Sequence, residues 1–438
     1  MGVRATMNLL ATRTGRLVAF FLLYLTQGLP IGFCAGAVAV YLRREGLGVD
    51  VMGAFVAAVY APWGFKWVAG PLVDLVGVER LGRRRGWILL AQILMVVGFL
   101  VASTLDPVED LSLFTWALVA VSGAAALQDV AIDALAVGTL REEERGLGNG
   151  LMFAGAYLGQ AIGGAGMLFL AGQWGGLGLS YVVLAAIVGV VWTVCLVAMR
   201  EPASTRPSLG VAALGGALWT YIKEVGSALL VGGRAWATLA LALLPMGAMA
   251  LGLALSSALA VEFGLTDNTI ASLSLIGAVA GATGSVTGGW ISDRLGHRRM
   301  LAVYVLLTVI PSVVLGVLMV DAGWVAPVDV GSERVPPAML VTAFEVASIA
   351  YGLVAGLAYG TRMAIFMGAC TSAVAATQFT AYMACMKLGT SIAAWWQGMA
   401  VARWGYPTTL AMDAAVGMLC LAALPWVGAP RVGAQKPG

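Results

Sequence analysis

Charged side chains are scarce in this sequence, and no long polar segment interrupts its apolar stretches. Among its 438 residues, 11% are Asp, Glu, Lys or Arg, whereas 60% are hydrophobic. This composition excludes a soluble catalytic domain, whose surface needs far more polar residues. The net charge of +3 is small, and the arginines gather beside the ends of apolar runs, where a lipid bilayer explains them better than a nucleic acid does. We therefore predict a membrane protein that binds no nucleic acid.

Residues that commonly bind metals are also few. The single histidine, His297, lies in an arginine-rich stretch, which leaves neither a histidine-based metal site nor a histidine proton relay. The five cysteines fall singly in apolar runs, without the paired spacing of a metal site or a disulfide framework. We expect unpaired packing residues, and we predict no metal and no cofactor. The cysteines are Cys34, Cys195, Cys370, Cys385 and Cys420.

The sequence consists instead of apolar runs of about 20 residues, the length that crosses a bilayer. Twelve runs, called spans 1 to 12 below, cover 17–42, 51–74, 87–104, 112–139, 147–171, 178–198, 236–262, 268–292, 300–320, 339–369, 377–402 and 407–427. Span 1 is too long for the apolar core of a signal peptide, so we expect it to stay uncleaved. Basic residues concentrate at both chain ends and in the even-numbered connections, which predicts cytoplasmic termini.

The chain repeats itself in two halves. Residues 1–200 hold six spans, residues 236–438 hold six more, and in the linker 201–235 we expect an interfacial helix near 211–231. Leu158-Gly159 in span 5 matches Leu388-Gly389 in span 11. Similar loops after the second span of each half are predicted to gate a carrier; they contain Gly70, Asp74, Gly82, Arg83, Arg84, Asp293, Arg294 and Arg298. We predict an all-α membrane protein of twelve transmembrane helices in two pseudo-symmetric halves, which is typical of alternating access.

Span 4 carries two acids, Asp129 and Asp133. They are one helical turn apart, so they share one helix face. Counted at about 1.5 Å per residue from the charged stretch 141–145, which we expect to lie in water, they reach roughly 12 and 18 Å into the membrane. A carboxylate at that depth costs several kcal/mol unless it is paired, hydrated or protonated, which indicates a function. The alternative is that these acids only hold helices together.

Three basic residues also lie inside spans. We expect Lys66 to pair with Asp129 or Asp133, and we predict that these three residues couple transport to protons, because a buried carboxylate can load and release one. Arg362 and Lys387 have no acid at the same depth in their half, which favours contact with a carboxylate or phosphate of the substrate. Lys387 could instead extend toward the membrane surface. The predicted substrate ligands are Tyr24, Gln27, Gln128, Gln160, Arg362 and Lys387.

Span 1 contains Pro30 flanked by Gly28 and Gly32. This pattern predicts a broken helix at mid-membrane, since proline removes a backbone donor and crowds the preceding turn. A break exposes backbone groups to a cavity. We therefore expect Tyr24 and Gln27 to line that cavity.

Several motifs of the chain resemble one family. They are LTQGLP at 25–30, FKW at 65–67, GPLVD at 70–74, LGRRRGW at 81–87, QD at 128–129, DA at 133–134, EERG at 143–146 and ATQF at 376–379. They resemble AmpG-type muropeptide permeases, a group within the major facilitator superfamily that also takes in acetyl-CoA transporters and siderophore importers. The resemblance implies a proton-coupled importer of the bacterial inner membrane, in which the positions of Lys66, Asp129 and Asp133 are functional.

We accordingly predict a transporter and no enzyme. It would import anhydro-muropeptides or related cell-wall fragments by proton symport and work as a monomer, with a small-molecule substrate, protons and the lipid bilayer as its partners. Longer AmpG permeases carry additional hydrophobic segments, so a siderophore importer is an alternative. The acid pair is also similar to those of intramembrane prenyltransferases, but the second acidic cluster that such an enzyme needs is missing from the sequence. A passive channel, with flux that neither saturates nor couples to protons, is the last alternative.

Overall fold

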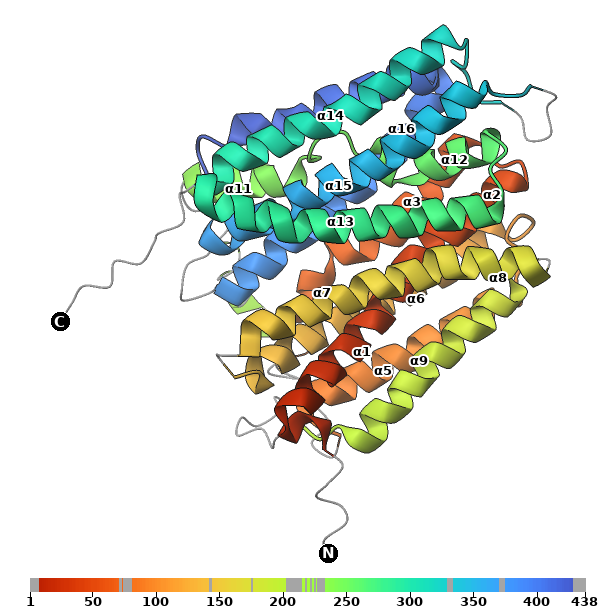
Figure 1. Cartoon of the computed structure of the whole chain (residues 1–438). Coiled ribbons are helices and arrows are strands. Elements are labelled where there is room, and N and C mark those ends of the chain that lie inside the picture. Colours follow the sequence, from red (N-terminus) through yellow and green to blue (C-terminus); the bar gives the residue numbers. More distant parts are fainter. Residues whose placement is uncertain are drawn as a thin grey trace, which may run out of the picture. The chain divides into compact units, whose positions relative to one another are not determined.

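The described residues fold as helices (Figure 1). The structure is a computed structural model that describes residues 8–70, 73, 81–141, 144–174, 176–201, 215–216, 219–220, 223, 226, 233–328, 334–369 and 375–427. Its packing divides the chain into two compact units. Unit 1 comprises Met1–Leu47, Ala58–Thr220 and Leu265–Leu275, and unit 2 comprises Gly48–Ala57, Tyr221–Gly264 and Ile276–Gly438.

Unit 1 holds most of spans 1 to 6, each of which satisfies its backbone hydrogen bonds internally as a helix. Its elements are η1 (Leu9–Ala11), α1 (Arg13–Gly32), η2 (Phe33–Val38), α2 (Ala39–Arg44), α3 (Val49–Gly64, whose first residues belong to unit 2), η3 (Lys66–Val68), α5 (Arg83–Ala102), α6 (Leu111–Thr139), α7 (Arg145–Ala161), η5 (Ile162–Gly166), α8 (Met167–Trp174) and α9 (Gly178–Ala198). The side chains of Phe20, Leu23 and Leu135 lie in its hydrophobic core.

Unit 2 is built in the same way around its own core, which contains Leu241, Leu301 and Phe366. Its elements are α11 (Gly233–Leu243), η6 (Ala250–Gly252), α12 (Ala254–Glu262), α13 (Asp267–Leu295, whose first residues belong to unit 1), α14 (His297–Asp321), α15 (Ala338–Ala369), α16 (Ala375–Met418) and η7 (Leu419–Ala423). The predicted interfacial helix of the linker falls largely outside the described residues.

The twelve predicted spans are confirmed. Ten helical stretches of the described chain are long and apolar enough to cross a membrane. The last of them, Gln378–Ala423, contains both span 11 and span 12, which meet at the non-helical residue Gly405 (φ 77°, ψ 177°). Span 7 adds the twelfth crossing, because it is divided between α11 and α12, two helices too short to cross alone.

The predicted break in span 1 is wrong. Helix α1 runs through Pro30 and continues without a gap as the π-helix η2 and then as α2. The N–H of Phe33 bonds to the carbonyls of both Leu29 and Pro30, so a widened turn absorbs the proline. The broken helix is span 7, at residues 244–253 between α11 and α12, a segment called the span-7 break below.

Glycines at matching positions of the two halves show that the internal repeat extends to the packing of the helices. A Cβ atom at Gly159 would lie 2.1 Å from the carbonyl oxygen of Leu25, and one at Gly389 would lie 2.3 Å from that of Leu243. Span 5 therefore packs on span 1 as closely as span 11 packs on span 7. Gly82 and Gly296 likewise precede α5 and α14 with φ of 88° and 95°, a conformation that favours glycine at both loops.

Candidate functional site

Lys66 and Asp129 form a buried ion pair inside unit 1. The Nζ atom of Lys66 lies 2.6 Å from Oδ2 of Asp129, and their side chains are only 3% and 4% exposed. Lys66 reaches this position because α3 ends at Gly64, shortly after Pro62, and the chain turns at Phe65 into η3. The structure thus selects Asp129, of the two acids considered, as the partner of Lys66.

Gln27 and Tyr24 of α1 complete this cluster of polar side chains. The Nε2 atom of Gln27 donates to Oδ1 of Asp129 at 2.6 Å. One turn along each helix, the hydroxyl of Tyr24 donates to Oδ1 of Asp133. Asp133 is half-buried, whereas Tyr24 and Asp129 are buried. One face of α1 therefore contacts both acids of α6, each through a different side chain.

Gln128 is next to these acids in sequence but belongs to the packing between α6 and α1. Its Nε2 atom donates to the carbonyl of Leu23 at 2.9 Å and to the hydroxyl of Thr26 at 2.8 Å, and the residue is fully buried. Gln160 is half-buried, and its backbone lies against Gly32, where a Cβ would approach the Gln160 carbonyl oxygen to 2.1 Å. The close packing of α1 on α7 thus fixes the position of Gln160.

Arg362 in α15 is buried in unit 2 and bonds to backbone carbonyls. Its Nη2 atom donates to the carbonyls of Leu241, Ala242 and Leu244, the last two at 2.9 and 3.2 Å. These carbonyls end α11, where the helix dipole favours a cation. Lys387, the other basic residue predicted to bind substrate, is half-buried in α16.

Asp413 in α16 complements Arg362 at the same break. It is fully buried, and its Oδ2 atom accepts from the backbone N–H of Ala250 at 2.8 Å. Its Oδ1 atom accepts from Nε2 of Gln397 at 2.6 Å. The span-7 break thus has a guanidinium at its carbonyl end and a carboxylate at its N–H end.

The loop before α5 has a partner that the sequence analysis missed. The Oε2 atom of Glu201 accepts from the backbone N–H groups of Arg84 and Arg85 at 2.8 and 3.0 Å. In return, the Nε atom of Arg85 donates to the carbonyl of Cys195 at 3.0 Å, near the end of α9. Gly82 is required here, because a Cβ would lie 2.8 Å from Oε2 of Glu201. The sequence signal was an acid directly after span 6, which we interpreted only as a boundary between halves.

The structure describes only part of the two predicted gating loops. Asp74 lies outside the described residues. In the second copy, Oδ1 of Asp293 lies 2.9 Å from Nε2 of His297, and the guanidinium of Arg294 stacks 3.5 Å from the ring centre of Trp290. The described contacts of Asp293 and Arg294 are therefore local to α13 and the start of α14.

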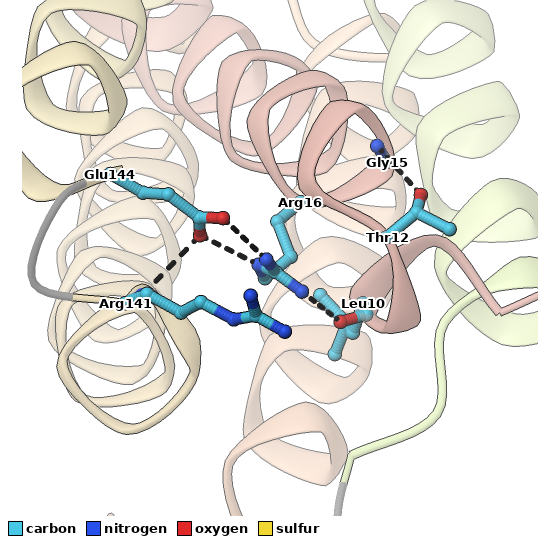
Figure 2. Close-up of polar contacts among 6 residues, drawn as sticks. All are labelled: Leu10, Thr12, Gly15, Arg16, Arg141 and Glu144. Atoms are coloured by element: carbon cyan, nitrogen blue, oxygen red, sulfur yellow. Dashed lines mark hydrogen bonds and ion pairs between the residues drawn. The ribbon is translucent and has the colours of Figure 1, made fainter.

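Arg16 and Glu144 form a second buried ion pair in unit 1 (Figure 2). The Nε and Nη2 atoms of Arg16 donate to the two carboxylate oxygens of Glu144 at 2.9 and 2.5 Å, and Nη1 donates to the carbonyl of Leu10. Glu144 also accepts from the backbone N–H of Arg141. The bond from the Arg16 guanidinium holds the pKa of Glu144 below its usual value.

The position of Glu144 corrects one sequence expectation. Stretch 141–145 was expected to lie in water as a whole, but Glu144 is only 2% exposed. Its bidentate bond to an arginine of α1 explains how the carboxylate can be buried, since each oxygen receives a charged donor. The partner is 128 residues away in sequence, so no local pattern revealed it.

Among the described residues, no group of three or more His, Cys, Asp or Glu side chains could hold a metal ion. The buried ionic groups of this site bond instead to one another, to neutral polar side chains or to backbone atoms. Ions placed in this way are typical of proteins that move charged or polar solutes across a membrane.

Comparison with protein families gives a match over residues 17–326, more than half of the chain, to the Major Facilitator Superfamily. The chain belongs to the major facilitator superfamily. Members of this superfamily are transporters, so the prediction of a transporter and no enzyme is confirmed, and the prenyltransferase alternative is removed.

Two relatives indicate which members of the major facilitator superfamily this chain is similar to. The chain is 26% identical over 292 residues to putative transporter AmpG 4 of Rickettsia conorii, covering 66% of this chain and 70% of that protein. It is 30% identical over 192 residues to the anhydromuropeptide permease of Escherichia coli K12, covering 44% of this chain and 39% of that one. The predicted resemblance to AmpG-type proteins is confirmed as a distant relationship.

Solved transporters share the fold over nearly the whole chain. The D-xylose-proton symporter superimposes with a TM-score of 0.69 at 13% identity, over 95% of this chain and 98% of that one. A POT family transporter in complex with a thioalcohol-conjugated peptide superimposes with a TM-score of 0.70 at 12% identity, over 94% and 95% of the two chains. At such identity these structures show the major facilitator fold alone.

Proposed function

We propose that this protein is a proton-coupled importer of anhydro-muropeptides or related cell-wall fragments, working by alternating access. Its AmpG-type relatives support the substrate class, because one of them is named an anhydromuropeptide permease. The observation that carries the proposal is the position of Asp133, a second acid beside the buried Lys66–Asp129 pair.

The charge balance of this cluster supports proton coupling. Lys66 compensates Asp129 directly, so an ionised Asp133 leaves one excess negative charge inside the membrane. A proton bound at Asp133 removes that charge. It also changes the bond to Tyr24, because a carboxylate accepts from the hydroxyl, whereas a carboxylic acid has a proton of its own to donate. Protonation is thereby transmitted to α1.

For substrate binding we propose Tyr24, Gln27, Gln128 and Gln160 in unit 1, together with Arg362 and Lys387 in unit 2. The Oε1 atoms of Gln27 and Gln128 are buried without a donor among the described residues, and so is the Nε atom of Arg362 without an acceptor. All three atoms are covered in this structure, so contact with the donors and carboxylates of a muropeptide requires the conformational change of alternating access.

We further propose that the two loops with Asp74 and Asp293 gate the carrier at the cytoplasmic side. Glu201 and Arg85 support this role, since they join the start of α5 to the end of α9 by charge-assisted bonds that can break and re-form. The concentration of basic residues at the chain ends supports cytoplasmic termini in a bacterial inner membrane. A monomer is sufficient for this mechanism.

Reconstituted uptake tests the proposal. Proteoliposomes receive labelled anhydro-muropeptide or a labelled ferric siderophore, with and without a pH gradient. A gradient of one unit can drive about tenfold accumulation in a one-to-one symport. We expect accumulation of the muropeptide that a protonophore abolishes, and we expect Asp133→Asn to equilibrate the ligand without accumulating it.

The matched control is Asp321→Asn, which neutralises an exposed acid at the end of α14 and should accumulate the ligand as the wild type does. Accumulation by Asp133→Asn that a protonophore still collapses would remove Asp133 from the coupling step. Uptake of the siderophore in place of the muropeptide would reject the substrate class, and unsaturable flux would indicate a channel.

A further inference from the structure

The span-7 break lies near the middle of the membrane. Helix α11 has 11 residues before it and α12 has 9 residues after it, which correspond to roughly 16 and 14 Å of helix. Interrupted backbone at this depth needs a partner for each exposed N–H and C=O group, because lipid provides none.

The N–H groups of the break are bonded to neighbouring spans. Those of Gly247, Ala248 and Ala250 donate to the Gly417 carbonyl, the Thr308 hydroxyl and the Asp413 carboxylate, at 3.1, 3.0 and 2.8 Å. These three acceptors come from α14 and α16. The donor side of the break is thus fixed by side chains and backbone of unit 2.

The carbonyl side is satisfied only at its start. Arg362 bonds the carbonyls of Leu241, Ala242 and Leu244. For the next carbonyls, those of Pro245, Met246 and Ala248, no hydrogen bond from another residue of the described chain is found. Pro245 and Met246 are half-buried, whereas Ala248 is fully buried, so the first two are the candidates for contact with a ligand.

Lipid cannot be the neighbour of these carbonyl oxygens, since an unpaired backbone acceptor in hydrocarbon costs several kcal/mol. A hydrated pathway or a bound ligand can lie beside these carbonyl oxygens, because both provide hydrogen-bond donors. Carriers of this architecture place their substrates near the bilayer midplane, often beside discontinuous helices. The unused acceptors therefore point to a ligand rich in donor groups.

We propose that the span-7 break is a backbone subsite of the carrier, in which the carbonyls of Pro245 and Met246 accept hydrogen bonds from hydroxyl or amide N–H groups of the substrate. Asp413 is a positioning residue that keeps the break open, and Arg362 has the same role through its Nη2 atom, in addition to the substrate contact proposed for it above. The proposal rests on the proposed function for its ligand, because sugar hydroxyls and peptide amides are the donors that an anhydro-muropeptide presents.

The positioning role follows from the charges. If span 7 closed into a continuous helix, the carbonyls of Ala242 and Leu244 would bond within the helix, and the Ala250 N–H would be taken from Asp413 in the same way. The Leu241 carbonyl would stay available to Arg362, because Pro245 has no N–H. Arg362 would then keep only the Leu241 carbonyl and Asp413 only the Gln397 amide, and the loss of hydrogen bonds at two buried ions is unfavourable. The break is therefore maintained as long as both ions are present.

The first experimental arm needs no ligand. Hydrogen–deuterium exchange is measured on peptides covering residues 244–253 in the purified full-length protein. We expect Arg362→Gln and Asp413→Asn to change the exchange of this segment by at least about tenfold relative to the wild type, to slower exchange where the segment closes into a helix and to faster exchange where it loses its fixed conformation. Asp321→Asn is the control and should leave the exchange unchanged.

Thr308→Val serves as a milder variant that keeps both ions, in case a charge-neutralised protein fails to fold. It removes the acceptor of the Ala248 N–H together with the hydroxyl's own bond to the Val305 carbonyl inside α14, and we expect faster exchange at the Ala248 amide. Unchanged exchange in Thr308→Val and in whichever charge variant folds would overturn the positioning role.

The second arm compares two probes in proteoliposomes, an anhydro-muropeptide and the same compound with its sugar hydroxyls methylated. In the wild type we expect methylation to raise KM by about fivefold for each hydrogen bond lost. In Arg362→Gln, Asp413→Asn or Thr308→Val, KM for the unmodified probe should already be raised, and methylation should change it less than about twofold.

If methylation raised KM in the variants as much as in the wild type, the proposed subsite would be rejected, because the donors of the probe would then bind elsewhere. Arg362→Lys adds a further discrimination: it keeps the positive charge but not the planar group, so a KM close to that of Arg362→Gln supports positioning. Absence of wild-type muropeptide uptake would reject the proposed function and this ligand together, while the exchange arm would still decide whether Arg362 and Asp413 hold the break.

Discussion

The buried Lys66–Asp129 pair makes an asymmetric prediction about stability. Removing one partner of a buried ion pair costs about 3–5 kcal/mol, because a charge is left without compensation. Lys66→Met leaves Asp129 and Asp133 without a cation, so we expect the full cost. Asp129→Asn leaves Lys66 near Asp133, which lies one helical turn from position 129 on α6 and can replace the lost partner. We therefore expect this variant to lose only about 1–2 kcal/mol of stability.

The double variant Lys66→Met/Asp129→Asn should recover to within about 1 kcal/mol of the wild type, since both ions are removed together. At about 2–4 °C per kcal/mol, Lys66→Met should lower the apparent unfolding temperature by about 10 °C. Tryptophan fluorescence of the purified protein during heating measures it, with Asp321→Asn as the control. Equal losses in the two single variants, or a double variant as unstable as their sum, would refute this account of the pair.

The remaining predictions concern three other contacts. Tyr24→Phe removes the donor to Asp133, and we expect the pH optimum of uptake to shift while the unfolding temperature changes little; an unchanged pH profile would contradict the coupling role of Tyr24. Glu144 has a lowered pKa, so its bond to Arg16 stabilises the protein above its usual pKa and is lost as the pH falls through the lowered value. Thermal unfolding of Glu144→Gln should therefore depend less on pH in the acid range than that of the wild type does. Gly389→Val places a side chain against the Leu243 carbonyl and should lower the yield of folded protein in detergent, as measured by size-exclusion chromatography.

The sequence allowed the fold to be predicted because lipid imposes few solutions on an apolar chain. Runs of about 20 residues can only be helices there, and the basic residues and paired loops indicate how the helices repeat. Depth along the helix also indicated which ions can meet. Counting residues from the span ends indicates that Lys66 can meet Asp129 or Asp133 without choosing between them, and the structure pairs it with Asp129 at 2.6 Å.

Partners that are distant in sequence could not be found in this way. Glu144 and Glu201 each appear beside arginines in polar stretches, where a solvated carboxylate is the ordinary expectation. The structure instead joins Glu144 to Arg16 and joins Glu201 to the backbone at the start of α5. Both are tertiary contacts between helix ends, so only the assembled unit shows that these acids are engaged.

The position of the broken helix shows why local sequence was insufficient. Span 1 has Pro30 with flanking glycines, and span 7 has Pro245 followed by Gly247, so both sequences favour a break equally. Only the surroundings differ. The backbone of span 1 has Gln128 beside it, a neutral amide that bonds one carbonyl, and the helix stays continuous.

Span 7 passes between an arginine of α15 and an aspartate of α16, each of which needs a partner inside the membrane. Breaking the helix supplies carbonyls to the first and N–H groups to the second, so the ions and the broken backbone stabilise each other. The two units therefore hold their buried ions differently. Unit 1 pairs Lys66 with Asp129, which leaves Asp133 bonded to a neutral hydroxyl, whereas in unit 2 both ions bond the backbone of the span-7 break. What distinguishes span 7 from span 1 is therefore the pairing of the ions beside it. Lys66 and Asp129 beside span 1 pair with each other, whereas Arg362 and Asp413 have no ion pair among the described residues and bond the backbone of span 7 instead.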